Sequence, residues 1–439
     1  MNHSHCGSIE HVSRRSLLQL AGMSGISWLT PLARSLAQTH ESNPQAKARS
    51  LIVLWLEGAP SQLETFDPHP GSDIAYGSLA RKTNAPGILL GDGLEQLAEQ
   101  MDSVSLIRAV TSKEGDHERA IYNLKTGYRP DPTLIHPAIG SIVCHEFNTE
   151  QDRSLDIPRH ISILPGGSPG RGGYLGDQYD SFKIFDPQQA IPDVVAQVEN
   201  HRQLKRISDL NFVDDQFVRR RLAQRLDVAP DSLKNQNIDA ALRMMSSDLL
   251  TAFDISGIPQ QERIQFGDTP FGRGCLTAIR LIKAGVRCVE VTLTGWDSHV
   301  KNHELQAARI AILDPAIASL IRELKRRELL DSTLVVCGGE FGRTPWLNAL
   351  GGRDHWPNGF TLALAGGGIK GGRVVGETSP CPVRNSTIPL EGLKDPHPVE
   401  DVHATILSAL GVDYQRELQT PIGRPMKLCQ GRPIEKLLT

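Results

Sequence analysis

Leu51-Ile52-Val53-Leu54-Trp55-Leu56 is a continuous apolar run that ends at Glu57-Gly58-Ala59-Pro60. A run of this length without polar alternation is typical of a strand that is covered on both faces of a sheet. The glycine and the proline after it predict a loop. Further apolar runs of this kind occupy residues 104–107, 286–293, 333–337 and 360–365.

Amphipathic stretches at 270–284 and 305–328 each precede one of these runs. Helix, short loop and buried strand in repetition predict an α/β protein with a mostly parallel sheet sandwiched by helices. Residues 194–255 are charged and helical in pattern, and they include Arg219-Arg220-Arg221. We interpret them as a helical insertion or cap within a single domain spanning 51–439.

The amino terminus has the pattern of an export signal. Ser13-Arg14-Arg15-Ser16 precedes a modest apolar stretch, and Ser35-Leu36-Ala37 provides small residues before a cleavage point. This pattern predicts a twin-arginine signal peptide at 1–37, with the twin-arginine export machinery as a partner. Cleavage near Ala37 would leave a flexible polar linker at 38–50 and a protein in the periplasm or outside the cell.

Composition excludes several classes of protein. The net charge of −3 lacks the basic excess of a nucleic-acid binder. No run after Leu36 reaches the roughly 20 apolar residues of a membrane span. Of the seven cysteines, Cys6 leaves with the signal and the rest form no CxxC pair, which argues against a disulfide framework or a thiolate metal site. Cys288 and Cys337 are expected in the core, and pairing of Cys381 with Cys429 stays open.

Carboxylates, imidazoles and arginines gather just after the predicted strands. In open parallel sheets, ligands bind beyond the carboxyl ends of the strands. Carboxylate plus imidazole without thiolate suits zinc, manganese, magnesium or calcium, and guanidinium groups match sulfate or phosphate. Together they indicate a metal-assisted hydrolase of an anionic ester. The residues in question lie at Glu57, Asp116-His117-Glu118-Arg119, Trp296-Asp297-Ser298-His299, Glu340-Phe341-Gly342-Arg343 and Arg353-Asp354-His355.

Plainer roles remain open for some of these groups. Glu57 could cap the next helix, and His299 with Asp297 could form an outer pair or a loop hydrogen bond. Asp354-His355 could be a turn. The combination of these residues favours a site more strongly than any one of them.

At these residues the chain resembles the bacterial domain-of-unknown-function family 1501, whose members are exported, sulfatase-like and part of the alkaline phosphatase-like superfamily. The resemblance runs in order along nearly the whole mature chain and implies an alkaline phosphatase/sulfatase-like fold. It supplies no substrate. The matching segments are Leu56-Glu57-Gly58-Ala59-Pro60-Ser61-Gln62, Thr65-Phe66-Asp67-Pro68, Gly173-Tyr174-Leu175-Gly176, Gly272-Arg273, Gly295-Trp296-Asp297-Ser298-His299, Gly339-Glu340-Phe341-Gly342-Arg343-Thr344-Pro345, Gly352-Arg353-Asp354-His355, Ala365-Gly366-Gly367-Gly368 and Gly423-Arg424-Pro425.

Similarity to sulfatases implies individual roles. It places His117 at the position of the nucleophile, because Thr126-Gly127-Tyr128-Arg129-Pro130 resembles the motif that follows it. It places Glu57 and Glu340 on metal-binding aspartates and Phe341 on a histidine. No cysteine or serine stands in a C/S-x-P-S-R context, so formylglycine chemistry is not supported.

The resulting hypothesis is a divalent metal site. Glu57, His117 and Glu340 would hold one cation, and Asp297, His299 and His355 would hold a second or complete a mixed site. Arg343 and Arg353, with Arg119 as a weaker candidate, would bind the non-reacting oxygens. His117 either attacks the ester itself or is a metal ligand while metal-bound hydroxide attacks; the second is favoured because Phe341 cannot ligate.

The expected substrate is a sulfate or phosphate ester, with sulfated polysaccharide as one candidate. The rival hypothesis is a catalytically degenerate member that binds anionic glycans or a protein partner, which the missing nucleophile supports. A metal-dependent isomerase or phosphomutase ranks last, because export would remove phosphorylated metabolites.

Overall fold

The computed structural model describes residues 48–191, 194–195, 198–222, 231–384 and 390–439. The expected signal at 1–37 and most of the expected linker lie outside these residues. Within 194–255 the described residues form two helices and a short 3-10 turn, while the role of this stretch as an insertion or cap stays a prediction. No helix in the described ranges is both long and apolar enough to cross a membrane.

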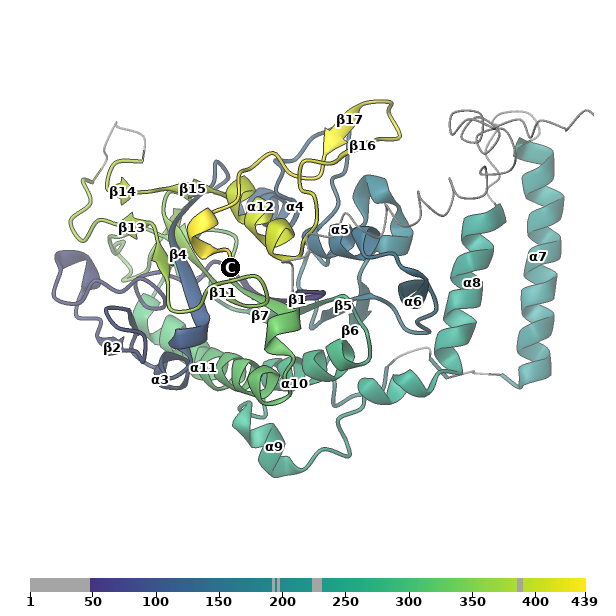
Figure 1. Cartoon of the computed structure of the whole chain (residues 1–439), viewed down its shortest axis with the longest axis horizontal. Coiled ribbons are helices and arrows are strands. Elements are labelled where there is room, and N and C mark those ends of the chain that lie inside the picture. The colour runs from purple at the N-terminus through teal and green to yellow at the C-terminus, as the bar shows by residue number, and fades with distance from the viewer. Residues whose placement is uncertain (1–47, 192–193, 196–197, 223–230, 385–389) are drawn as a thin grey trace, which may run out of the picture. The chain divides into compact units, whose positions relative to one another are not determined.

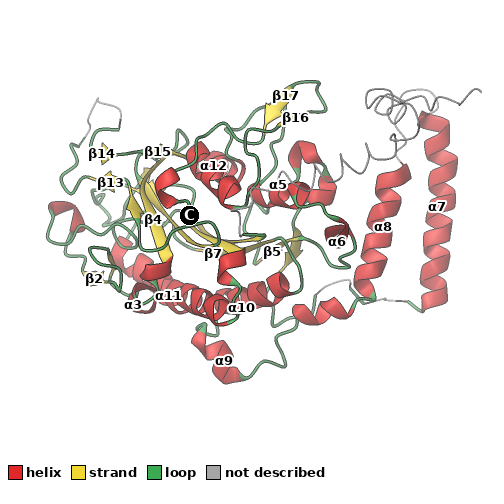
Figure 2. Cartoon of the chain, in the orientation of Figure 1, coloured by secondary structure: helices red, strands yellow, loops and turns green. Residues whose placement is uncertain are grey.

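The centre of the described chain is a nine-stranded sheet (Figures 1 and 2). All of its pairings are parallel except those of β11, which lies antiparallel between β4 and β8. In spatial order its strands are β12 (Val374–Val375), β4 (Val104–Thr111), β11 (Phe360–Gly366), β8 (Thr333–Gly338), β1 (Ser50–Glu57), β7 (Cys288–Thr294), β5 (His160–Ile163) and β6 (Phe182–Ile184), with β15 (His397–Pro398) also paired to β4. The predicted strands and the mostly parallel sheet are therefore confirmed.

Helices and short ribbons complete the fold. The helices are α3 (Glu95–Ala98), α4 (His117–Thr126), α5 (Ile139–Glu146), α6 (Glu150–Arg153), α7 (Asn200–Leu222), α8 (Asp231–Met245), α9 (Gln260–Gln265), α10 (Pro270–Lys283), α11 (Asn302–Arg326) and α12 (Val399–Ala409). The 3-10 turns are η2 (Asp73–Ala75), η3 (Met101–Ser103), η4 (Gly173–Leu175), η5 (Asp177–Tyr179), η6 (Asp248–Ala252), η7 (Leu330–Ser332) and η8 (Glu435–Leu437). The antiparallel ribbons pair β2 (Ala80–Lys82) with β3 (Leu89–Gly91), β9 (Gly342–Arg343) with β10 (His355–Trp356), β13 (Glu377–Thr378) with β14 (Leu393–Lys394), and β16 (Glu417–Gln419) with β17 (Pro425–Lys427).

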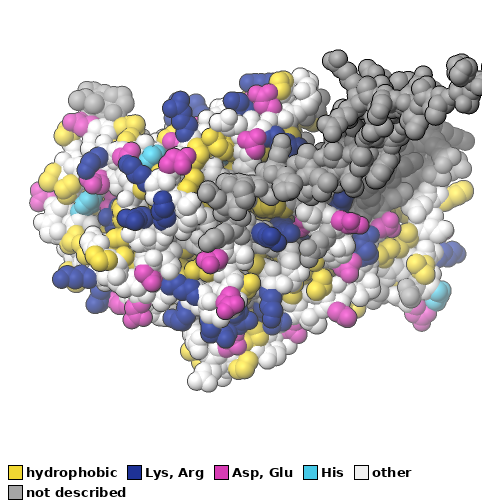
Figure 3. Space-filling model, in the orientation of Figure 1, with side chains coloured by type: hydrophobic (Ala, Val, Ile, Leu, Met, Phe, Trp, Pro, Cys, Tyr) yellow, Lys and Arg dark blue, Asp and Glu magenta, His cyan; other side chains and the backbone are white. Residues whose placement is uncertain are grey.

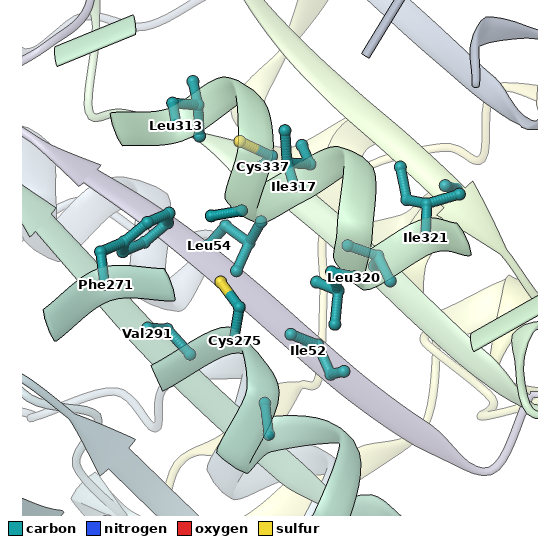
Figure 4. Packing of buried hydrophobic residues seen from close by; sticks show 14 of the residues in the cluster. Ile52, Leu54, Phe271, Cys275, Val291, Leu313, Ile317, Leu320, Ile321 and Cys337 are labelled. Atoms are coloured by element: carbon teal, nitrogen blue, oxygen red, sulfur yellow. The ribbon is translucent and has the colours of Figure 1, made fainter. Parts of the chain in front are cut away.

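The two faces of β1 pack into two different cores, which explains why its sequence is apolar throughout. Ile52 and Leu54 belong to the cluster that contains α10 and α11, whereas Leu51 and Trp55 belong to the cluster that contains α4, α5 and α12. Figure 1 shows these two groups of helices on opposite sides of the sheet. Figure 4 shows the first cluster, where Cys275 of α10 and Cys337 of β8 meet the apolar side of β1.

The burial predicted for two of the cysteines is confirmed. Cys288 and Cys337 are buried in the core. Cys381 is exposed and Cys429 is buried, and both are free thiols. On the face drawn in Figure 3, basic and acidic side chains are interspersed, in keeping with the small net charge.

A buried ion pair attaches α4 to the sheet. Lys125 Nζ lies 3.0 Å from Glu290 Oε2 on β7 and also donates to the carbonyl of Ser168 at 2.6 Å. Burial alone would raise the pKa of Glu290, but the charge of Lys125 and the contacts of His160 lower it to about 2. Because α4 begins at His117, this pair also influences where that side chain lies.

We predict that Lys125→Met destabilises the protein by about 3–5 kcal/mol, because it leaves Glu290 charged and unpaired in the interior. The pKa of Glu290 is lowered in the folded state, so the ionised pair stabilises the fold above pH 4.5, the ordinary pKa of the group, and this contribution is lost as the pH falls toward 2. Urea denaturation of wild type and Glu290→Gln between pH 7 and pH 3 tests this pH dependence. If the difference between their free energies of unfolding does not shrink as the pH falls, the stabilising role of the ionised pair is contradicted.

Candidate metal centre

Four parallel strands deliver the site residues to one edge of the sheet. Strands β7 and β8 flank β1 in parallel, and the loops after β7 and β8 carry Asp297 and Glu340. Strand β4 has the same direction, because β11 is antiparallel to both β4 and β8. The chain after β4 enters α4 at His117, whose helix is capped by Asp116 accepting from the Arg119 amide at 3.2 Å. The β9–β10 ribbon adds His355.

Three imidazoles and one carboxylate meet at this edge. His117, Asp297 and His355 place one ligand atom each within 4.8 Å of one another. His299 Nε2 lies 3.1 Å from Asp297 Oδ1 and 2.9 Å from His355 Nε2. Asp297 Oδ1 is also 3.6 Å from the Nε2 atoms of both His117 and His355. The structure thus brings together four of the residues expected to hold a metal.

Two glycines allow the loops to approach closely enough for this cluster. Gly58 has φ +106°, and a Cβ there would lie 2.7 Å from the backbone nitrogen of Asp297. The amide of Gly58 donates a hydrogen bond to Glu340 Oε1 at 3.0 Å. A Cβ on Gly352 would lie 1.9 Å from the backbone of His299. A side chain at either position would force apart loops that carry the cluster.

The second ring nitrogen of each imidazole has its own acceptor. His117 Nδ1 lies 2.7 Å from Glu340 Oε1, and His299 Nδ1 lies 2.9 Å from Asp354 Oδ1. His355 Nδ1 lies 2.8 Å from the carbonyl oxygen of Gly115. Such outer contacts hold imidazole rings in position and leave the other nitrogen facing the cluster.

Arg343 lies directly behind Asp297. Its side chain is 0% exposed, and Nη2 donates to Asp297 Oδ1 at 2.6 Å. The remaining donors bind the carbonyl oxygens of Gly58, of Ala59 at 2.9 Å and of Arg353 at 3.2 Å. The guanidinium therefore orients the carboxylate and joins the loops around it.

The charges of the cluster shift its pKa values in different directions. The hydrogen bond to Glu340 raises the pKa of His117 despite partial burial. Burial lowers the pKa of His355. Burial alone would raise the pKa of Asp297, but the hydrogen bond and charge of Arg343, followed by the nearby imidazoles, lower it. The carboxylate at the centre is therefore held in its ionised form.

Two carboxylates expected to bind metal occupy other positions. Glu57 faces the loop after β5, where its Oε1 accepts from the Gly167 amide at 3.3 Å, and it is not part of the cluster of His117, Asp297 and His355. Glu340 is fully buried and binds His117 through Nδ1, so it lies behind an imidazole of the cluster.

The arginines expected to bind substrate are already paired. Arg353 is 0% exposed and donates to Glu64 and to the carbonyl oxygens of Ile74, Thr344 and Pro345, which makes it part of the framework. Arg119 is half-exposed and forms two hydrogen bonds with Glu114, at 2.7 and 3.1 Å. Protein acceptors thus bind Nε and Nη2 of each of these arginines and of Arg343, and the binding of substrate oxygens by them stays a prediction.

Several supporting contacts were not expected from the sequence, although Asp354 and Phe341 themselves were among the residues singled out. Asp354 holds His299, and Asn348 Nδ2 donates to Asp354 at 3.1 Å. The adjacency of Asp354 and His355 was the only available signal, since a backbone carbonyl such as that of Gly115 has no sequence signature. Phe341 packs against the rings of His117 and His355, with centroids 5.0 and 4.5 Å away. It fills the wall of the cluster rather than contributing a ligand.

This chain matches one protein family and, weakly, several solved structures. A family model described as "Protein of unknown function (DUF1501)" matches residues 48–438. A comparison with curated proteins finds no match.

Solved structures match at low identity. A protein in the alkaline phosphatase superfamily from Vibrio parahaemolyticus has a TM-score of 0.37 and 12% identity, covering 90% of this chain and 71% of its own. The PsFucS1 sulfatase from Pseudoalteromonas sp. has a TM-score of 0.36 and 11% identity, covering 87% and 72%. The C-terminal periplasmic domain of EcEptC from Escherichia coli, in complex with Zn, has a TM-score of 0.37 and 10% identity, covering 91% and 93%. Likenesses this weak assign no residue role in this chain.

We predict that Arg343→Lys destabilises the protein by about 2–4 kcal/mol, because a lysine cannot reach all four acceptors and leaves buried carbonyl groups unpaired. The matched control is Arg119→Lys, at a half-exposed arginine that pairs with Glu114, for which a much smaller change is expected. Chemical denaturation measures both. Equal effects of the two substitutions would contradict the framework role of Arg343.

Proposed function

The chain belongs to the DUF1501 family, and we propose that it is a metal-dependent hydrolase of sulfate or phosphate esters. The observation that carries this proposal is the convergence of His117, Asp297 and His355, with His299 beside them, at the carboxyl edge of the sheet. Carboxylate and imidazole ligands together suit a divalent cation. This is also the edge at which ligands bind in open parallel sheets.

The residues of the cluster would divide the work as follows. His117, His299, His355 and Asp297 would hold the cation, which supplies Lewis-acid activation of the ester and of water. Arg343 keeps Asp297 ionised and oriented. The position of His117 Nε2, 3.6 Å from Asp297 and in the same group as His355, supports the ligand role of His117 over the role of nucleophile.

The pairing of the arginines changes how an anionic substrate would be recognised. Arg119, Arg343 and Arg353 all donate to protein acceptors. The positive charge that attracts the ester would therefore come mainly from the bound cation, so affinity for substrate is expected to depend on metal. This differs from a site in which arginines bind the sulfate or phosphate directly.

The exposure of the cluster supports the proposal that the sulfate or phosphate ester belongs to a large substrate. Asp297 and His299 are 46% and 43% exposed. An open site of this kind can accept a sulfate or phosphate on a polymer such as a sulfated polysaccharide, whereas small-molecule sites enclose most of their ligand. We propose such an ester as the substrate.

We also propose that the protein is exported. The twin-arginine pattern at Arg14-Arg15 supports export in a folded state, so that the protein would act in the periplasm or outside the cell. The rival function, a degenerate member that binds anionic glycans or a partner, rests on the missing serine or cysteine nucleophile. Four converging ligands oppose it, because binding an anion requires no such set.

We predict hydrolysis of aryl sulfates or of phosphate mono- or diesters by the metal-loaded mature protein. Asp297→Asn should lower kcat/KM by at least about 100-fold, because it removes the charged ligand of the cluster. The matched control is Asp331→Asn, at an exposed position before β8 at the opposite end of that strand, which should leave activity unchanged. Absence of turnover across the panel with zinc, manganese, magnesium and calcium would favour the binding function.

A further inference from the structure

The hydrogen-bond partners determine which ring nitrogens carry protons. His355 Nδ1 faces the carbonyl of Gly115, which can only accept, so Nδ1 must be the N–H. His117 Nδ1 and His299 Nδ1 face the carboxylates of Glu340 and Asp354, which accept in the same way when ionised. All three neutral imidazoles therefore present a bare Nε2 lone pair.

The three Nε2 atoms lie around one carboxylate oxygen, Asp297 Oδ1. His299 Nε2 and His355 Nε2 are 2.9 Å apart, with Asp297 Oδ1 at 3.1 Å from the first and 3.6 Å from the second. His117 Nε2 is buried and has no hydrogen-bond partner among the described residues. Acceptors that converge at such distances repel one another unless a cation lies between them.

The spacing of these atoms suits a particular kind of cation. Ligand atoms held at roughly 2.0–2.1 Å from a tetrahedral metal lie roughly 3.3–3.4 Å from each other. Four of the six distances among these atoms lie between 2.9 and 3.6 Å, on either side of this value, and the ligand atoms of His117, Asp297 and His355 all lie within 4.8 Å of one another. Three nitrogens and a single carboxylate suit zinc-type ions, whereas magnesium and calcium require a shell of oxygens.

We propose that the centre binds one zinc-type cation through the Nε2 atoms of His117, His299 and His355 and the carboxylate of Asp297, and that it discriminates against magnesium and calcium. This inference deepens the proposed function and rests on it only for the location of the site. Four protein ligands would complete a tetrahedral shell, so an ester would have to add as a fifth ligand, from the side where Asp297 and His299 are exposed.

Glu340 is then a positioning residue rather than a ligand. Its Oε1 already accepts from His117 Nδ1 and from the Gly58 amide, at 2.7 and 3.0 Å. It fixes the tautomer of His117, as Asp354 does for His299. Outer partners of this kind typically change metal affinity by about 10–100-fold, and loss of a ligand costs more.

The test is metal binding by the folded apo-protein, measured independently of turnover. Chelator-treated mature protein is titrated with Zn²⁺ against a competing chelator, and with Co²⁺ followed by visible absorption. We expect one ion per chain, an intense tetrahedral Co²⁺ spectrum, and no displacement by millimolar Mg²⁺ or Ca²⁺. Two ions per chain, a weak octahedral spectrum or displacement by Mg²⁺ would overturn the proposal, as would absence of binding, in which case the imidazoles share only a proton.

Variants separate ligands from positioning residues. His299→Ala and His355→Ala should weaken Zn²⁺ binding by more than about 1,000-fold, whereas Glu340→Gln, which keeps an acceptor for His117, should weaken it by about 10–100-fold. His201→Ala, at an exposed histidine of α7, is the matched control and should bind normally. Thermal unfolding of each apo variant checks that it is folded. A loss for Glu340→Gln as large as for His299→Ala would make Glu340 a ligand.

The outcomes for metal and for function are distinguishable. Tight binding of one Zn²⁺ or Co²⁺ without turnover of any ester would support this inference and overturn the hydrolase proposal. Ester turnover that requires Mg²⁺ or Ca²⁺, without Zn²⁺ binding, would do the reverse.

Discussion

The contact between the buried guanidinium of Arg343 and the carboxylate of Asp297 is the interaction on which the site depends. Arg343 also binds backbone carbonyls of the loop after β1 and of the segment before β10. Three loops that are distant in sequence therefore share one donor group. The charge of Arg343 offsets the burial of Asp297, which lets an ionised carboxylate lie at the centre of an imidazole cluster.

The rest of the fold supports this arrangement through packing on both sides of the sheet. The apolar side chains of β1 alternate between two cores, so the strand cannot shift register without exposing one set. The ion pair of Lys125 and Glu290 attaches α4 to β7 from within. The position of His117 at the start of α4 is thus set by contacts two turns further along the helix.

The long buried strands, α10 and α11 could be predicted because their periodicity and apolar length are local properties. Strand β5 was missed, since His160-Ile161-Ser162-Ile163 is short and alternates apolar residues with polar ones that become buried only in the folded chain. The direction of β11 was also not predictable, because an isolated apolar run carries no sign of its neighbours. Among the site residues, the chemical types follow from the sequence, whereas the protein contacts of Arg353 and Glu57 arise only in the folded chain.

The sequence by itself determined the α/β class, the family and the set of residues at the strand ends, because each depends on composition, order or local pattern. Only the tertiary structure decided which of these residues meet. Three features depend on contacts between segments tens to hundreds of residues apart. They are the contact of Glu57 with Gly167, the enclosure of Arg353 by Glu64 and carbonyl groups, and the nitrogen of His117 that faces Asp297. Those contacts follow from the packing of loops at one edge of the sheet, which no local pattern encodes.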